Sequence, residues 1–172
     1  MIEPFETPRL RLRPITLDDV DALLDLDSDP EVMRYISGGQ PSSRAEVTEI
    51  VQASLDSRWM ASARATGDLI GWFALHPTGD VPEELELGYR LRRAAWGNGY
   101  ATEGSLALID LAFARPGVRR VWAQTMAVNT ASRRVMERCG LRYVRTFHLD
   151  WAEPIAGADQ GEVEYEILRD DS

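Results

Sequence analysis

Residues 86–103, E-L-G-Y-R-L-R-R-A-A-W-G-N-G-Y-A-T-E, decide the fold of this chain. The segment Glu84 to Leu91, which overlaps the start of this stretch, alternates acidic and apolar residues. This alternation predicts a half-buried strand. A turn with Gly97 and Gly99 follows, and apolar residues then recur at helical spacing as far as Ala114. We therefore predict a strand that runs through a glycine turn directly into a helix.

A turn of this kind predicts a site for an anion. Backbone N–H groups at the start of a helix lack partners and lie at the positive end of the helix dipole. Gly97 and Gly99 can adopt positive φ and leave no Cβ in the path of a phosphate. Arg92 and Arg93 can add charge-assisted hydrogen bonds. On spacing alone, an ordinary strand-to-helix turn is an equally good interpretation.

Two common nucleotide motifs do not match this turn. A P-loop requires a Lys followed by Ser or Thr after its second glycine, and this turn has neither. The dinucleotide fingerprint requires a third glycine and an acidic residue about 20 positions further on, whereas Asp110 lies inside the predicted helix. A different phosphate-bearing ligand is expected.

Composition predicts one domain over residues 1–172. The chain has 172 residues and is 44% hydrophobic, which is enough for one core. Its first residues lack a secretory pattern and no apolar run is long enough for a membrane helix, so we expect a cytoplasmic protein without membrane partners. Cys139, His76 and His148 form no spacing typical of a disulfide or metal site, so no metal is expected.

The charge changes sign along the chain. Residues 1–88 contain 7 Arg and 17 acids, residues 89–145 contain 11 Arg and 3 acids, and residues 146–172 contain 1 Arg and 8 acids. A cationic segment of net charge +8 inside an acidic protein argues against nucleic acid as a partner and favours one small polyanionic ligand. Arginines scattered over solvated helix faces are the alternative explanation.

Periodicity and turn residues predict the remaining elements. We expect strands at 9–15, 58–64, 69–76, 84–91, 119–126, 141–150 and 162–169, and helices after Thr16, after Pro30, from Ser42 or Ser43 to about Asp56, at 99–114 and at 129–138. Hairpins followed by strand–helix alternation predict an α/β fold with a mixed sheet and helices on its faces.

Three segments together resemble a known family. Residues 86–103 resemble motif A of the GNAT N-acetyltransferases, residues 7–13 (T-P-R-L-R-L-R) resemble the opening strand of the branch with ribosomal-protein N-terminal alanine acetyltransferases, and residues 129–141 (N-T-A-S-R-R-V-M-E-R-C-G-L) resemble its second cofactor segment. The resemblance implies a mostly antiparallel, seven-stranded sheet with about four helices, splayed between strands four and five. It also implies acetyl-CoA as the cosubstrate.

Cofactor contacts follow from the same resemblance. The pantetheine arm would lie between strands four and five, against the backbone at Leu87, Gly88, Tyr89 and Leu91, with Asn129 on the other side. The pyrophosphate would lie on N–H groups of the turn and the helix start. Arg133 or Arg134 would reach the 3′-phosphate, with solvated helix arginines as the alternative. The residues implied around the pyrophosphate are Arg92, Arg93, Trp96, Gly97, Asn98, Gly99, Tyr100, Ala101 and Thr102. Ala94 stands where the family often has Gln or Arg, so either Arg92 or Arg93 substitutes for that residue or the backbone suffices.

Catalytic roles are predicted for two residues. Glu86, or a water that it holds, is the candidate general base, with an exposed strand glutamate as the alternative. Many members of the superfamily place a tyrosine seven residues after the motif's asparagine, but Met136 stands there. Ser132 is therefore the candidate for proton donation or thiolate stabilisation, with helix capping as the alternative. A backbone N–H near Gly88 or Tyr89 would polarise the acetyl carbonyl.

The expected reaction is direct attack of a primary amine on acetyl-CoA in a ternary complex. Tyr35, Trp72, Asp150 and Trp151 are candidate acceptor contacts, with a core role as the alternative for the aromatic residues. The acidic outer segments favour a cationic amine, either a protein N-terminal amine or a small molecule. A non-catalytic acyl-CoA sensor is the alternative function, and edge strands would allow a homodimer.

Overall fold

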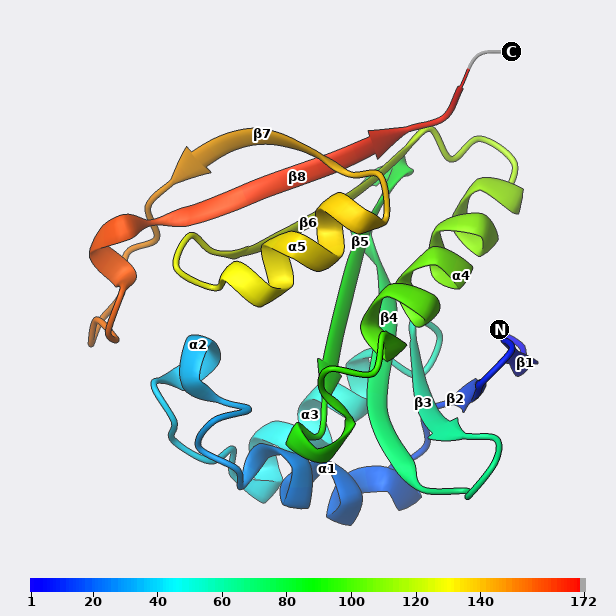
Figure 1. Cartoon of the computed structure of the whole chain (residues 1–172), viewed down its shortest axis with the longest axis horizontal. Coiled ribbons are helices and arrows are strands. Elements are labelled where there is room, and N and C mark those ends of the chain that lie inside the picture. Colours follow the sequence, from blue (N-terminus) through cyan, green and yellow to red (C-terminus); the bar gives the residue numbers. More distant parts are fainter. Residues whose placement is uncertain (171–172) are drawn as a thin grey trace.

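The computed structural model describes residues 1–170 and joins eight strands in one sheet, in the order β1-β2-β3-β4-β5-β6-β8-β7 (Figure 1). Every neighbouring pair is antiparallel except β5 and β6. The expected mixed, mostly antiparallel sheet is confirmed, with one strand more than the seven predicted because Phe5–Glu6 adds a short edge strand. The strands are β1 (Phe5–Glu6), β2 (Leu10–Pro14), β3 (Arg58–Ala63), β4 (Leu69–Thr78), β5 (Val81–Leu91), β6 (Arg120–Met126), β7 (Arg142–Phe147) and β8 (Glu162–Leu168).

Five α-helices lie among the described residues, at the five places that periodicity predicts, where the resemblance implied about four. They are α1 (Val20–Asp27), α2 (Arg34–Ser37), α3 (Arg44–Ala53), α4 (Tyr100–Ala114) and α5 (Thr130–Arg138). Local chemistry sets their ends. Ser43 begins α3 with a capping box, because its hydroxyl accepts from the Glu46 N–H while the Glu46 carboxylate accepts from the Ser43 N–H. Gly140, at φ +88°, follows the end of α5.

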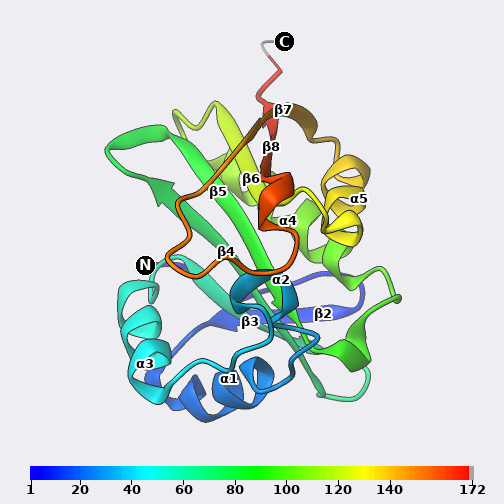
Figure 2. The same cartoon turned by 90° about the vertical axis from the view of Figure 1, so that its left-hand side faces the viewer.

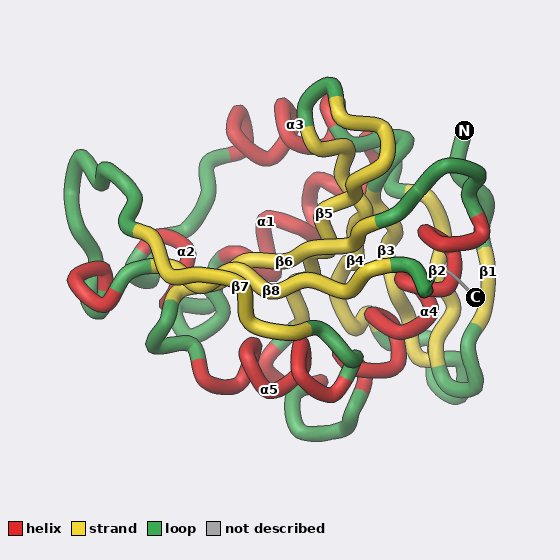
Figure 3. The backbone as a smooth tube through the Cα atoms, turned by 90° about the horizontal axis from the view of Figure 1, so that it is seen from above, coloured by secondary structure: helices red, strands yellow, loops and turns green. Residues whose placement is uncertain are grey.

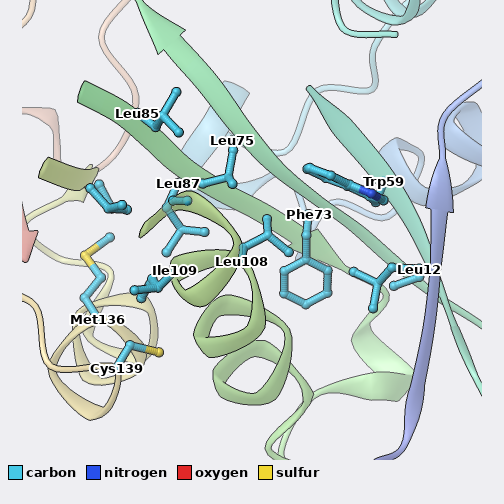
Figure 4. Packing of buried hydrophobic residues seen from close by; sticks show 14 of the residues in the cluster. Leu12, Trp59, Phe73, Leu75, Leu85, Leu87, Leu108, Ile109, Met136 and Cys139 are labelled. Carbon is cyan, nitrogen blue, oxygen red and sulfur yellow. The ribbon is translucent and has the colours of Figure 1, made fainter. Parts of the chain in front are cut away.

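The helices cover both faces of the sheet (Figure 3). On one face, α1 and α3 bury a cluster that includes Leu23, Val51 and Met60. On the other face, α4 and α5 pack Leu108, Ile109 and Met136 against apolar side chains of the sheet (Figure 4). Strands β3 and β4 therefore present alternate residues to two separate cores, whereas β5, β6 and β8 contribute apolar residues only to the core under α4 and α5.

The sheet opens between β5 and β6. These two strands pair only from Glu84 to Glu86, opposite residues 120–122. Beyond Glu86, β5 pairs only with β4, while β6 continues along β8, so the two arms of the sheet diverge (Figure 1). Alternate backbone N–H and C=O groups of residues 87–91 are thus left without a strand partner on this side. The predicted splay is confirmed, and its V-shaped opening is available to a ligand.

A long loop between β7 and β8 crosses toward α2 at the mouth of this opening (Figure 2). The two segments are in contact, since a Cβ added at Gly38 would lie 2.9 Å from Cγ2 of Ile155. Among residues 1–170, no helix has the length and apolar character that crossing a bilayer requires.

Candidate active site

The glycine turn has the geometry that an anion requires. Gly97 and Gly99 have φ of +74° and +80°, and Gly99 precedes the first residue of α4. No side chain caps this end of α4. The N–H groups of its first turn therefore have no acceptor within the helix and point to the front of the turn. A Cβ at Gly97 would meet no atom within 4 Å, so the space beside the turn is open. These features fit a pyrophosphate held by backbone groups.

Side chains of the turn serve mainly to hold its shape. The indole N–H of Trp96 donates to the Leu91 carbonyl at 3.0 Å, and the Asn98 amide donates to the carbonyls of Ala95 and Trp96 at 3.1 Å. The turn is therefore fastened to the end of β5. The side-chain N–H groups of Trp96 and Asn98 are thus already engaged. These two residues can contribute to the predicted cofactor site mainly through their backbone N–H groups.

The two arginines expected to contact phosphate are already paired with aspartates near the end of α1. Arg92 lies 2.9 Å from Asp25, and Arg93 donates two hydrogen bonds to Asp29 at 2.8 and 2.9 Å. Arg93 and Asp29 are 64 positions apart in the chain, so the local sequence does not reveal this pairing. In this arrangement the backbone, not these guanidinium groups, provides the donors of the turn.

Arg9, which was not predicted as a site residue, supports the glycine turn through its side chain. Arg9, just before β2, donates to the Asn98 carbonyl at 2.7 Å and stacks over the Tyr100 ring, with its guanidinium carbon 4.5 Å from the ring centroid. It also forms an ion pair with Glu103 at 2.7 Å. Residues 7–13 and residues 86–103, two of the three segments that carry the family resemblance, are therefore in direct contact. Their joint resemblance to one family was the sequence signal that could have linked Arg9 to the turn.

The start of α5 is positioned by Asn129. Its side chain accepts from the Ser132 N–H at 3.3 Å and donates to the Thr125 hydroxyl at 3.1 Å, so Asn129 caps the helix. Of the two candidates for the 3′-phosphate, Arg133 donates to Tyr165 and to the Ala127 carbonyl, whereas Arg134 is exposed. Arg134 remains the better candidate for a phosphate contact.

A hydroxyl pair lies on the α4–α5 side of the opening. Tyr89 of β5 and Ser132 of α5 have their hydroxyl oxygens 3.2 Å apart. Burial raises the pKa of Tyr89 to about 12, although the hydrogen bond with Ser132 opposes this shift. Met136, which occupies the position of the family's usual tyrosine, is buried beside Ile109 (Figure 4). The sequence placed only the backbone of Tyr89 in the site, so its hydroxyl is an addition made by the fold.

A carboxylate lies at the apex of the opening. Glu86 belongs to the last pair between β5 and β6, and it accepts a hydrogen bond from Gln124 of β6 at 3.2 Å. Burial raises the pKa of Glu86, although the Gln124 hydrogen bond opposes this. Because side chains alternate along β5, Glu86 and Tyr89 face opposite sides of the sheet. The arrangement offers a proton acceptor on one side and a hydroxyl donor on the other.

The expected acceptor residues occupy different places. Trp72 lies on the same face as Glu86, opposite Arg90 in the β4–β5 register. Tyr35 is on α2, and Asp150 and Trp151 are on the loop after β7, which meets α2 at the mouth of the opening. Trp72 thus lies beside the open part of β5, with its ring near Gly88, while the other three belong to the segments at the rim of the opening.

A hollow of about 530 Å³ lies between α1 and the start of the turn, lined by Asp25, Asp29, Arg92, Arg93 and Ala94, among others. None of Glu86, Tyr89 and Ser132 lines it. The hollow is therefore space beside the turn, and the candidate catalytic residues lie outside it.

Known proteins share this arrangement. Residues 9–142 match the sequence profile of the acetyltransferase (GNAT) domain. A relative from Aspergillus fumigatus, named FsC-acetyl coenzyme A-N(2)-transacetylase, is 33% identical over 182 residues, which cover 97% of this chain and 77% of the relative. The crystal structure of an acetyltransferase from Agrobacterium tumefaciens covers 98% of this chain and 96% of its own, with a TM-score of 0.76 and 26% identity.

A third similarity concerns the fold alone. RimL, described as a ribosomal L7/L12 alpha-N-protein acetyltransferase in complex with coenzyme A, has a TM-score of 0.79 at 20% identity, over 96% of this chain and 98% of its own. Together these findings define the class as acyl-CoA-dependent acetyltransferases. The chain belongs to the GNAT acetyltransferase family and is an N-acetyltransferase that uses acetyl-CoA as its cosubstrate.

Proposed function

We propose that the protein transfers an acetyl group from acetyl-CoA to a primary amine, by direct attack of the amine in a ternary complex. The observation that carries this proposal is the placement of Glu86 and the Tyr89–Ser132 pair on opposite sides of one strand at the opening of the sheet. The A. fumigatus relative supports a nitrogen acceptor, since its name specifies N(2) as the position acetylated.

Glu86 is proposed as the general base. A protonated amine cannot attack a thioester, so a proton has to leave the nitrogen before or during the reaction. Burial raises the pKa of Glu86, which makes it a stronger base than an exposed glutamate while Gln124 holds its carboxylate in place. Glu86 can accept the proton directly or through one water.

Tyr89 and Ser132 are proposed to protonate the departing thiolate. Acetyl-CoA supplies the activated acetyl group, and its sulfur needs a proton when the thioester bond breaks. Tyr89, with a pKa raised to about 12, keeps its proton at neutral pH, and Ser132 lies 3.2 Å away to share the donor role. The pair revises the expectation from sequence, in which Ser132 acted without a tyrosine.

The acceptor is proposed to be cationic in solution. Glu162 of β8 lies on the same face of the sheet as Glu86, because its strand neighbours Val163 and Tyr165 point into the opposite core. It is 6% exposed, its pKa is raised by burial, and within residues 1–170 it has no ion-pair partner. A carboxylate of this kind favours the entry of an ammonium group.

An acceptor screen tests the function. Purified protein is incubated with acetyl-CoA and a panel of N-terminal peptides, polyamines and small amines; free thiol is measured and each product is identified by mass spectrometry. We expect thiol release with at least one amine, together with an N-acetylated product. Tight binding of acetyl-CoA with no turnover on any amine would contradict the proposal and favour an acyl-CoA sensor.

A further inference from the structure

A buried arginine on the amine side of the sheet has no role in the reaction described above. Arg58, the first residue of β3, is 9% exposed. Its Nε is enclosed and has no hydrogen-bond partner, and its nearest polar side-chain neighbour is Nε2 of His76, 3.4 Å from one terminal nitrogen. Within residues 1–170, no carboxylate forms an ion pair with Arg58. A buried cation normally requires such a partner.

A second arginine increases the positive charge at this place. The guanidinium groups of Arg58 and Arg90 lie 3.8 and 5.3 Å from the Trp72 ring centroid. Asp27 is the one buried carboxylate that faces them; it accepts from Arg90 at 2.8 Å and also from Ser42 at 2.7 Å. Two cations, one buried and one partly buried, thus share one buried anion.

Burial and neighbouring charge act on the pKa of both Arg58 and His76. Burial, and then the charge of Arg90, lower the pKa of Arg58 to about 10, while Asp27 opposes the shift. His76, with a pKa lowered by burial and by Arg58, does not supply negative charge. The cluster therefore carries one uncompensated positive charge at neutral pH, and an anion bound there would restore the balance.

The position of Arg58 relates it to the reaction centre. Arg58, Ala74 and Gly88 form one row across β3, β4 and β5, so their side-chain positions lie on the same face, about 10 Å from end to end. Only small residues follow Arg58 in this row. The Trp72 ring bridges the distance, because it stacks on Arg58 and its Cζ3 is 3.8 Å from where a Cβ of Gly88 would lie. Gly88 in turn is next to the predicted acetyl site.

We infer that Arg58, supported by Arg90 and Trp72, forms an anion subsite that binds a carboxylate group of the acceptor, so that the preferred acceptor is a small amino-acid-like molecule with an amine and a carboxylate. The planar guanidinium matches a carboxylate in shape and charge. The amine end would lie at Glu86 and Gly88, and the carboxylate end one indole width away. This inference rests on the proposed function and narrows its acceptor to a zwitterion.

The test compares matched acceptors. Kinetics are measured with L-amino acids and with the corresponding L-amino acid amides, which retain the amine but lack the carboxylate. For the wild-type protein we expect kcat/KM to be about 10- to 100-fold higher for the acid of the best pair, as expected for a charged hydrogen-bonded contact. In Arg58→Gln this preference should fall to less than about threefold, while Arg58→Lys should retain part of it.

Controls separate this result from a loss of folding or of the basic reaction. Arg44→Gln, which removes an exposed arginine of α3, should keep the full preference. Thermal unfolding and acetyl-CoA affinity are measured for each variant. Acetyl transfer to amines without any preference for the acid over the amide overturns the subsite but leaves the proposed function intact. The subsite is also overturned if Arg58→Gln keeps the preference for the acid, or if it loses the same factor in kcat/KM for the acid and the amide. A protein that transfers acetyl to no amine contradicts the proposed function itself.

Discussion

Arg9 and Glu103, 94 positions apart in the chain, form an ion pair at 2.7 Å that joins the opening strand to the helix after the glycine turn. Glu103 also accepts from the Thr7 hydroxyl at 2.6 Å and from the Arg9 N–H at 2.9 Å. The other end of Arg9 holds the Asn98 carbonyl. One carboxylate thus fixes the residue that supports the predicted pyrophosphate site.

The first prediction concerns Glu103→Gln. Although burial opposes it, the hydrogen bonds from Thr7 and Arg9 lower the pKa of Glu103. The ionised Glu103 therefore stabilises the folded protein fully at pH values above 4.5, the ordinary pKa of a glutamate. This contribution is lost as the pH falls through the lowered pKa of Glu103. At pH 7 the variant should lose about 1–3 kcal/mol of unfolding free energy, measured by urea denaturation. The difference in unfolding free energy between the variant and the wild-type protein should become smaller at acidic pH.

Glu49→Gln is the matched control for this change. Glu49 is exposed on α3, so its variant should stay within about 0.5 kcal/mol of wild type. A difference between Glu103→Gln and wild type that does not depend on pH would show that the carboxylate charge has no part in fixing the turn.

The second prediction compares two glycines with the same backbone constraint. Gly97 and Gly117 have φ of +74° and +84°, and a Cβ at either would meet no atom within 4 Å. Alanine at each position should therefore cost a similar amount of stability, about 1 kcal/mol. Only Gly97→Ala should weaken acetyl-CoA binding, by about tenfold in calorimetry, because its backbone belongs to the predicted pyrophosphate site. Equal affinities for the two variants would place the pyrophosphate elsewhere.

The third prediction follows from the ion pair between Arg93 and Asp29. Because this guanidinium is exposed and already held by a carboxylate, Arg93→Ala should change the dissociation constant of acetyl-CoA by less than about threefold. A loss as large as that of Gly97→Ala would mean that Arg93 leaves Asp29 and binds phosphate when the cofactor enters.

Much of the fold could be predicted from local patterns, because alternation, helical spacing and turn residues act over a few neighbours. The strand before the glycine turn was expected at 84–91 and extends over Val81–Leu91, and the following helix was expected at 99–114 and begins at Tyr100. The resemblance to known acetyltransferases added the splay of the sheet, which no local pattern contains.

The missed parts of the site depend on contacts between distant segments. Alternation indicates that Tyr89 shares a face with Leu87 and Leu91, but only the packing of α5 brings Ser132 to its hydroxyl. The pairing of Arg92 with Asp25 and of Arg93 with Asp29 likewise depends on the packing of the end of α1 against the end of β5. Charge counts along the sequence cannot show which cations are already neutralised.

The fourth prediction tests the hydroxyl pair. Tyr89→Phe should lower kcat by about 100-fold or more, with little change in acetyl-CoA affinity, because a proton donor acts only in the chemical step. Ser132→Ala should also lower kcat, and the double variant should be little worse than Tyr89→Phe if the two hydroxyls act together. Tyr143→Phe, which removes a hydroxyl bonded to Thr146 on an edge strand, is the control and should keep full activity. Full turnover in Tyr89→Phe would exclude the tyrosine as the donor.

The fifth prediction is a pH dependence that originates from Glu86. A general base works only when deprotonated, and burial raises the pKa of Glu86 above its ordinary value of 4.5. Activity should therefore decline as pH falls through this raised pKa, at a higher pH than an exposed glutamate would cause. In Glu86→Gln, kcat should fall by about 100-fold at pH 7, and this acidic limb should disappear from the profile of the remaining activity.

The profile is measured as kcat against pH at saturating acetyl-CoA and amine, with Glu83→Gln, an exposed residue of the same strand, as the control. An unchanged acidic limb in Glu86→Gln would assign the base to another group.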